Sequence, residues 1–473
     1  MVIKPKQSKG VSPLPPPVEA RLELNNGREA IAVEFTDERL SAHAGIAGFW
    51  SWLRGTGVIA ELERLLPHPQ PVSNNHLTPL NKALTFMHGL WCGAEKLTQM
   101  AHLRRDPLAP ELLGVPRLAS QSTLSRFLQG FGSAGANLRC FRPLWRWAMR
   151  QLPSRPEGYS LDLDSTRLLH EDGTQEGVRV GYTRLGTKPC LHPLLAVLEE
   201  AKLVAQFWLR PGNCSCANNA VAFVLDLFDN LPAHIRLRVI RADSGFCWEE
   251  LLALWERLGL PYIVTARLTA RIQTLVARDT IWTATAVPGT EVAEVLHQEP
   301  GWRTARRLIL VRHHVEEKGR AGGKKLIDVP GYLFQTLVTS LPASVPPVEV
   351  WRDYNQRAGC EGVIKELDQN YALPKLIVHS FWGTEAALCL AVCSYNLVVL
   401  FQRKLGWLER VSLNTLRFRL FLTAGKLAAP QGRKTLRLAV PKREQDWWRR
   451  VWEKLHCPFP NCHAVENRPA FSG

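Results

Sequence analysis

The side chains best suited to catalysis lie between positions 354 and 368, in the segment Tyr-Asn-Gln-Arg-Ala-Gly-Cys-Glu-Gly-Val-Ile-Lys-Glu-Leu-Asp. A helix has about 3.6 residues per turn, so Tyr354, Arg357 and Glu361 fall on one of its faces. A carboxylate can hold a divalent metal ion, and an arginine can hold phosphate oxygens in two-point geometry. The segment therefore predicts a helix face suited to metal and phosphate chemistry.

Two further carboxylates occupy positions typical of strands: Asp164 in Leu-Asp-Leu-Asp-Ser-Thr and Asp243 in Val-Ile-Arg-Ala-Asp-Ser-Gly-Phe. Near the ends of adjacent central strands, they can approach each other although they are distant in sequence. Two Mg²⁺ ions roughly 3.5–4 Å apart can activate the attacking oxygen and stabilise the leaving oxygen of a phosphodiester. Three carboxylates are enough to hold them. We therefore predict that Asp164, Asp243 and Glu361 are catalytic and bind Mg²⁺, with Mn²⁺ as a substitute.

The elements that must position these acids follow from the apolar patterns. Three strands in a meander are expected at Tyr159–Thr166, Cys190–Leu198 and Leu203–Leu209, followed by alternating helices and strands. The alternating elements are expected at Asn218–Asn230, Leu237–Ala242, Trp248–Leu258 and Pro261–Ala266. This order predicts an α/β fold with a ribonuclease H-like catalytic core.

The remaining segments suggest how the chain is organised. Proline-rich residues 1–20 predict a disordered arm, and residues 40 to 150 carry helical signals, including the N-cap residue Ser120. Residues 270 to about 345 are β-rich without helical signals, with long strands expected at Arg306–Val315 and Gly331–Thr339. The predicted domains are a disordered arm 1–20, a helical N-terminal DNA-binding domain 21–155, the first part of the core 156–269, an inserted β subdomain 270–345, the glutamate helix and following helix 346–400, and a basic helical C-terminal region 401–473.

Charge and composition predict the partner. The net charge is +16, and residues 401–473 carry fifteen Lys and Arg against five Asp and Glu, which favours a nucleic acid. The eleven cysteines are scattered, as expected of reduced thiols in the cytoplasm; neither Cys214-x-Cys216 nor Cys457-x4-Cys462-His463 supplies a usual four-ligand zinc set. The longest apolar run, Ala386–Phe401, predicts a buried helix, and we expect a soluble protein without a membrane partner.

These motifs resemble those of bacterial insertion-sequence transposases of the DDE superfamily, in the branch whose glutamate helix carries Tyr-x2-Arg-x3-Glu-x6-Lys. Tyr354, Arg357 and Glu361 match that helix. The resemblance extends over residues 75 to 403. It implies a DNA transposase that binds terminal inverted repeats, cleaves the ends and transfers the 3′ hydroxyls to target double-stranded DNA. It also implies a homodimeric synaptic complex that works in the bacterial cytoplasm at the nucleoid.

The resemblance also suggests individual roles. Asp164 is preferred over Asp162 because the family's first acid directly precedes Ser or Thr, although Asp162 stays open as an alternative. Tyr354 and Arg357 are expected to contact DNA. The family lysine falls at Asp368, which has the opposite charge, and Lys365, one turn earlier, is expected to replace it at the DNA. Trp302 is the candidate by region for an aromatic that receives a flipped base, with a core role as its alternative.

Two other functions are alternatives to a DNA transposase. Asp162-x-Asp164-x-Thr166 also satisfies the Asp-x-Asp-x-Thr motif of haloacid dehalogenase-type phosphatases, in which Asp162 would be the nucleophile. The other alternative is a catalytically weakened or inactive, transposase-derived DNA-binding protein, for which Asp368 is the main argument.

Overall fold

The computed structural model describes residues 22–456 except 26, 71, 74–75, 172–173, 184, 278–280, 315–330 and 408. The chain divides into two compact units between Arg39 and Leu40. In the first unit, β1 (Leu22–Asn25) pairs antiparallel with β2 (Ala30–Val33). The predicted arm 1–20 and the Cys457-x4-Cys462-His463 motif lie outside the described residues. All elements below belong to the second unit.

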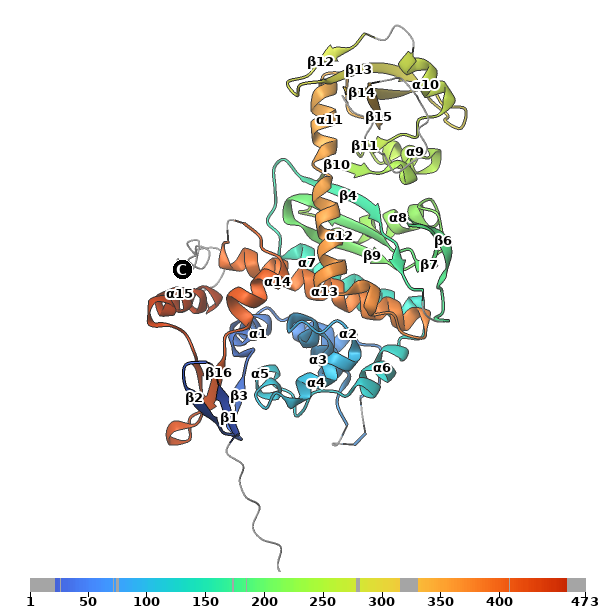
Figure 1. Cartoon of the computed structure of the whole chain (residues 1–473). Helices are drawn as coiled ribbons and strands as arrows, with labels where there is room; N and C mark the ends of the chain where they lie inside the picture. Colours follow the sequence, from blue (N-terminus) through green and yellow to red (C-terminus); the bar gives the residue numbers. More distant parts are fainter. Residues whose placement is uncertain are drawn as a thin grey trace, which may run out of the picture. The chain divides into compact units, whose positions relative to one another are not determined.

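The predicted meander and strand–helix alternation form the centre of a large sheet (Figure 1). Its central strands, in spatial order, are β9 (Leu203–Trp208), β8 (Leu194–Leu198), β4 (Tyr159–Ser165), β10 (Leu237–Ala242) and β11 (Tyr262–Thr265). β8 runs antiparallel to both β9 and β4, whereas β4, β10 and β11 are mutually parallel. The connecting elements are η3 (Glu199–Ala201), α8 (Ala220–Asn230), η4 (Ser244–Phe246) and α9 (Glu249–Arg257). The mixed α/β class is as predicted.

The strand predicted at Cys190–Leu198 is divided in two. Its first part belongs to β7 (Gly186–Leu191), and its second part is β8. The break contains Pro193, which has no N–H to donate to a ladder. β7 lies between β5 (Leu168–Leu169) and β6 (Arg179–Thr183) in a separate three-stranded sheet.

The β-rich segment after β11 extends the central sheet at its edge. Its strands are β12 (Thr283–Ala284), β13 (Thr290–His297), β14 (Arg306–His314) and β15 (Tyr332–Thr339). β15 pairs antiparallel with β11, so the sheet has nine strands within the described residues. The expectation that this segment lacks helices is wrong, because α10 (Ala270–Ala277) precedes the strands. Its apolar residues Ile272 and Val276 lie four positions apart and are buried, which gives even this short segment a helical face.

The N-terminal part is helical from Ala44 onward, as predicted, but the start of the predicted helical domain 21–155 is wrong, because β1, β2 and β3 (Leu40–Ser41) precede the first helix. It comprises η1 (Ala44–Ile46), α1 (Ala47–Gly55), α2 (Val58–Leu65), α3 (Pro79–Trp91), α4 (Leu97–His102), η2 (Leu103–Arg105), α5 (Ala109–Leu113), α6 (Gln121–Gln129) and α7 (Ala134–Arg150). Ser120 is the N-cap of α6, and its side chain accepts a hydrogen bond from the Thr123 amide at 3.3 Å. This is the cap that the sequence predicts.

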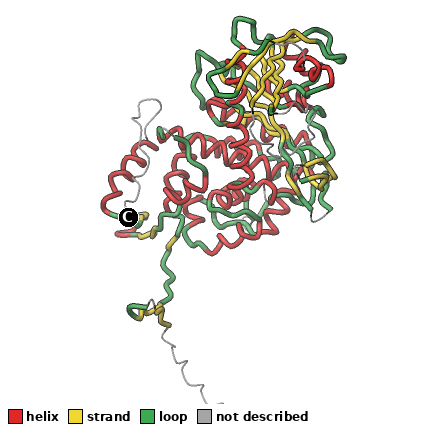
Figure 2. Tube along the Cα trace, turned by 45° about the horizontal axis from the view of Figure 1, so that its top comes forward, coloured by secondary structure: helices red, strands yellow, loops and turns green. Residues whose placement is uncertain are grey.

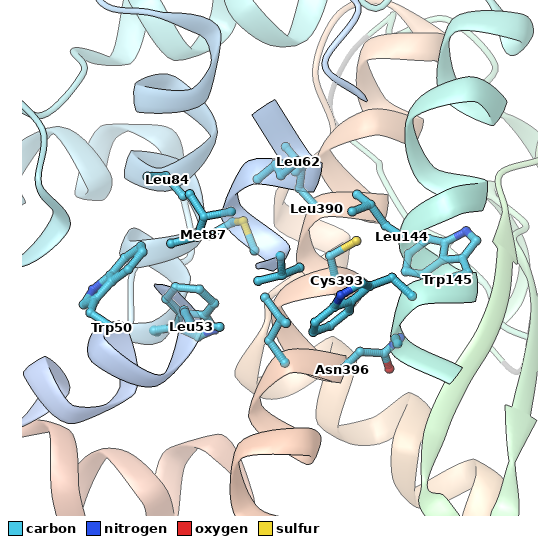
Figure 3. A pocket seen from close by; sticks show the side chains of 16 residues that line it. Trp50, Leu53, Leu62, Leu84, Met87, Leu144, Trp145, Leu390, Cys393 and Asn396 are labelled. Carbon is cyan, nitrogen blue, oxygen red and sulfur yellow. The ribbon is translucent and has the colours of Figure 1, made fainter. Parts of the chain in front are cut away.

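A long apolar helix, α13 (Phe381–Leu405), lies between the N-terminal helices and the central sheet (Figure 1), in the part of the molecule where helices are crowded together in Figure 2. It is long and apolar enough to span a membrane, but its most apolar stretch is entirely buried inside the protein. It packs against α3, α6 and α7 as well as β9 and α12 (Ala358–Asn370). A small apolar cavity of about 30 Å³ lies where α13 meets the N-terminal helices, with Trp50, Met87 and Cys393 among its lining residues (Figure 3). The predicted buried helix is therefore the element around which the helical part packs.

The C-terminal part is only partly helical. It comprises α14 (Leu413–Leu416), the π-helical turn η6 (Arg417–Phe421), β16 (Gly425–Ala428), η7 (Pro430–Gly432), β17 (Thr435–Leu438), η8 (Lys442–Glu444) and α15 (Gln445–His456). β16 pairs with β17 and with β3 (Leu40–Ser41). The prediction of a helical region is wrong over β16 and β17, where Leu436 and Leu438 alternate with polar residues and pack against the core.

Candidate active site

The predicted glutamate helix is formed by two helices, α11 (Pro347–Asn355) and α12, which follow one another along one rod (Figure 1). Arg357 keeps right-handed backbone angles (φ −58°, ψ −19°). The amides here bond three residues back instead of four: Arg357 N–H donates to Tyr354 O at 3.0 Å, and Cys360 N–H donates to Arg357 O at 2.9 Å. The expectation of one uninterrupted helix is wrong at this tighter turn.

Gly359, next to this turn, faces the ends of the Lys202 and Glu199 side chains, and an added Cβ atom would clash with both. Glycine at position 359 therefore leaves room for these two side chains beside the rod.

The two aspartates lie at the same edge of the sheet. In the parallel pair β4–β10, Leu163 is opposite Ala242, so Asp164 and Asp243 are the next residues on neighbouring strands. Asp243 directly follows β10, and its Oδ1 accepts a hydrogen bond from the Gly245 amide at 2.8 Å. The carboxyl ends of parallel strands are where α/β proteins commonly hold ligands.

Arg357 joins the rod to this edge. Its Nη2 lies 2.8 Å from Asp164 Oδ2 and donates to the Leu163 carbonyl at 3.3 Å. Its Nη1 lies 3.9 Å from Glu361 Oε1, one turn further along α12. The guanidinium is 8% exposed and the Glu361 side chain is 62% exposed, so a buried cation lies between a buried and an open carboxylate.

The charge state of Asp164 depends on this arrangement. Burial raises the pKa of Asp164 to about 6, opposed by Arg357 and reinforced by the negative charges of Asp243 and Glu361. Burial acts to lower the pKa of Arg357, but the surrounding negative charges, with Asp164 first, outweigh it and raise that pKa. The three predicted acids therefore act on one another electrostatically.

The side chains face one open cleft of about 780 Å³, whose lining includes Asp164, Asp243, Arg357, Glu361 and Lys365. Lys365 is exposed and lies one turn beyond Glu361 on α12.

Asp368 also lines this cleft, one turn beyond Lys365. Burial raises the pKa of Asp368 to about 6. Its Oδ1 atom is buried and has no hydrogen-bond partner within the described residues.

Asp162, the alternative first acid, has a different environment. It is fully buried and accepts two hydrogen bonds from Arg241, at 2.6 Å and 3.0 Å. It does not line the cleft. A nucleophile must be reachable by substrate, so this burial disfavours the phosphatase interpretation and favours Asp164 as the acid of the first motif.

Tyr354 and Trp302 do not line the cleft, although Tyr354 lies close enough to Arg357, Asp243 and Asp164 to interact with them electrostatically. The Tyr354 hydroxyl accepts a hydrogen bond from Thr265 Oγ1 at 2.5 Å, and its ring packs against a small apolar cluster beside the sheet. Trp302 is only 9% exposed, and the guanidinium of Arg306 lies 5.2 Å from its ring centroid. Their predicted contacts with DNA remain predictions; Trp302 packs as a core residue, whereas Tyr354 is half-buried.

Some residues of the cleft were not anticipated. Thr166 and Arg167 line it directly after β4, and Arg167 Nη1 donates to the Gly212 carbonyl at 2.5 Å. Because they follow Asp164 by two and three positions, the sequence alone could have predicted that they lie near the site. Cys216, named above only in the incomplete zinc motif, does not line the cleft, but its Sγ lies 3.2 Å from Ser165 Oγ.

The chemistry of the three acidic side chains suits a hard cation, although their spacing in this structure is wider than a metal site needs. Each of the three acids presents carboxylate oxygens, the ligand type that Mg²⁺ prefers. Asp164 and Asp243 each accept one hydrogen bond from a backbone amide, and their carboxylates have further lone pairs that can bind a cation. No three His, Cys, Asp or Glu side chains gather closely enough to hold a metal ion within the part of the chain that the structure describes.

Comparisons with known proteins define the class. The family described as transposase DDE domain group 1 matches residues 24–457, and the chain belongs to this family of DDE transposases. Among solved structures, the chain is similar to piggyBac transposase in a cryo-EM structure of its synaptic complex with hairpin DNA, with 12% identity, 81% of each chain covered and a TM-score of 0.43. No curated protein matches the chain.

Proposed function

We propose that the protein is the transposase of a bacterial insertion sequence, which binds the element's terminal inverted repeats, cleaves its ends and joins the freed 3′ hydroxyls to target DNA. The supporting observation is that Asp164, Asp243 and Glu361, borne by β4, the end of β10 and α12, line one open cleft. Membership of the DDE transposase family supports the same chemistry. The branch with the Tyr-x2-Arg-x3-Glu-x6-Lys helix is the one that the motif favours.

The proposed catalytic acids are also the proposed metal ligands. When Mg²⁺ or Mn²⁺ is bound by Asp164, Asp243 and Glu361, it supplies an activated oxygen nucleophile and charge stabilisation for the leaving 3′ oxygen. Arg357 holds Asp164 in place through the 2.8 Å ion pair. Lys365, exposed on the cleft wall, is positioned to contact a DNA phosphate.

The wider setting follows from the chemistry of transposition. Two element ends have to be processed together, so we propose a homodimer in the synaptic complex. The site of action is the bacterial cytoplasm, at the nucleoid. The basic charge of the chain suits this polyanionic partner.

The test is cleavage of a duplex carrying the element's end, with Mg²⁺, by wild type and by Asp164→Ala, Asp243→Ala and Glu361→Ala. Each variant should lose cleavage by at least about a hundredfold while still binding the duplex, because the acids act in the chemical step. Glu63→Ala is the control, because it removes an exposed carboxylate of α2 that lies outside the cleft. Unchanged cleavage in the three alanine variants would overturn the triad.

A second candidate function is a DNA-binding protein that has lost most of its cleavage activity. The observation that favours it is Asp368, a carboxylate in the cleft where the resembling branch has a lysine. If this charge impairs DNA approach, Asp368→Lys should cleave faster than wild type. Equal rates would show that Lys365 is sufficient.

A further inference from the structure

A second cleft, of about 610 Å³, lies in the helical N-terminal part beside the start of α6. Its charged lining is formed by Lys82 of α3, Arg104 of η2, Arg117 of the preceding loop and Arg126 of α6, and none of the lining residues that the structure describes is Asp or Glu. Four cations that converge on one concave surface create a strongly positive potential there.

Most of these cations are not neutralised by the protein itself. Lys82, Arg104 and Arg126 form no ion pair with any acidic residue that the structure describes. The positive charge of Arg126 adds to the effect of partial burial in lowering the pKa of Lys82. The fold therefore holds like charges together, which is unfavourable unless an anion joins them.

The neighbouring polar groups also suit an anion. Ser120 caps α6 at the cleft, where the helix N-terminus adds a partial positive charge. His68 also lines the cleft, and its Nε2 lies 2.8 Å from the Phe127 carbonyl. Its Nδ1 is buried without a hydrogen-bond partner within the described residues.

The exposed face of α6 favours a duplex over other anions. Gln121, Ser122, Arg126 and Gln129 are exposed along one side of the helix, whereas Leu124 and Leu128 are buried on the other. Amide and guanidinium groups on a protruding helix can read base edges while the flanking cations hold phosphates. An acidic peptide would use the charges but leave this polar face without a role.

We propose that this basic cleft is a DNA-contact surface, in which Lys82, Arg104 and Arg126 hold backbone phosphates of a duplex that passes along α6. The inference rests on the proposed function, and it assigns DNA contact to a place away from the acidic triad. α13 packs against both α6 and α12, so the basic cleft and the active site belong to one packed unit.

The experiment measures binding of a labelled duplex of random sequence by fluorescence anisotropy over a range of salt concentrations. Arg104→Gln/Arg126→Gln is compared with Arg64→Gln/Arg150→Gln, which removes the same charge from exposed arginines of other N-terminal helices. The first variant should bind at least about tenfold more weakly, and its slope of log K against log salt should fall by about 1.8. The control should stay close to wild type.

A charge-retaining variant separates phosphate contact from misfolding. Arg104→Lys/Arg126→Lys should bind nearly as well as wild type, because a lysine also neutralises a phosphate. The proposal would be overturned if the glutamine variant bound the duplex as tightly as the control. Loss of affinity for polyglutamate in that same variant would then assign the cleft to an acidic protein. If the glutamine variant loses DNA binding while the three alanine variants of the triad still cleave as fast as wild type, only the proposed function is overturned.

Discussion

Among single residues, the contact between Arg357 and Asp164 governs the charge at the active site. Burial raises the pKa of Asp164 to about 6, and Arg357 is the main group that opposes this rise. Arg357→Gln removes the opposing cation, so the pKa of Asp164 should rise further and cleavage should require a higher pH. The acid limb of the pH profile of cleavage, measured at constant Mg²⁺, should therefore move upward.

Arg357→Lys is the matched control, because it keeps the positive charge and loses only the forked geometry. Its acid limb should lie between those of wild type and Arg357→Gln. Coincident limbs for all three proteins would show that Arg357 does not set the ionisation of Asp164.

Asp368 provides a second prediction, on stability. Its pKa is raised to about 6 by burial, above the value of about 3.9 in an unfolded chain. The folded state therefore binds this proton more tightly, and stability is lost as the pH rises through about 6. Asp368→Asn should stabilise the protein by about 1–2 kcal/mol at neutral pH and by little near pH 4.5. Thermal unfolding at the two pH values measures this, and an equal effect at both would contradict it.

The sequence predicts the acids of the site better than their partners. Asp164 and Asp243 are recognisable because each ends a short buried apolar run. The bond between Asp162 and Arg241 depends on the register of two strands that are far apart in sequence, which local patterns do not contain. The sequence also leaves Tyr354 on the same helical face as Arg357, whereas the tertiary structure directs it to a bond with Thr265.

Among the elements, the attachment of α11 to the sheet depends on a buried ion network. Arg241 bonds Asp162 and also the Asp353 carbonyl at 2.7 Å, and Arg238 reaches Asp353 at 2.6 Å. Removing one partner of a buried pair leaves an uncompensated charge. Asp162→Ala should therefore lower the free energy of unfolding by about 3 kcal/mol, measured by denaturant titration.

Asp243→Ala is the comparison, because Asp243 lines the cleft but forms no ion pair with any residue that the structure describes. It should lower the free energy of unfolding by much less than Asp162→Ala. A loss as large as that of Asp162→Ala would mean that both acids are structural.

Two glycines in helices give a prediction about the contact between α13 and α6. A Cβ atom at Gly383 of α13 would lie 2.8 Å from the Leu128 carbonyl oxygen of α6, which is backbone and cannot move aside. A Cβ atom at Gly362 of α12 would meet nothing within 4 Å. Gly383→Ala should lower the melting temperature by several degrees, whereas Gly362→Ala should raise it slightly, because alanine favours a helix by about 1 kcal/mol. A fall in both would contradict the assigned packing.

The elements also show where sequence patterns are informative. The strand expected at Leu237–Ala242 has the bounds of β10, because a short buried apolar run has few alternatives in an α/β chain. β16 and β17 have four residues each and form through pairing with each other and with β3, close to the start of the described chain. Such short strands carry too few alternations to be recognised before their partners are known.

For the whole second unit, the order of the central strands follows from the sequence, because a meander followed by strand–helix–strand connections leaves few topologies. The continuation of the sheet through β12–β15 does not follow from the sequence, because β15 and β11, which pair with each other, are far apart in the chain. The convergence of the basic cleft is equally non-local: Lys82, Arg104 and Arg126 come from three elements. Net charge predicts a polyanionic partner, whereas only the fold shows where the positive charges converge.

The place of α13 in the chain has a consequence for how the protein is made. Both aspartates, the glutamate and the basic cleft lie before Phe381, whereas the buried helix against which α3, α6, α7, β9 and α12 pack begins there. A ribosome that has translated the first 380 residues has therefore incorporated every proposed functional residue but not the helix that completes the core. Until residues 381–405 leave the exit tunnel, the nascent chain exposes the apolar surfaces that this helix will cover, and such exposed surfaces favour aggregation.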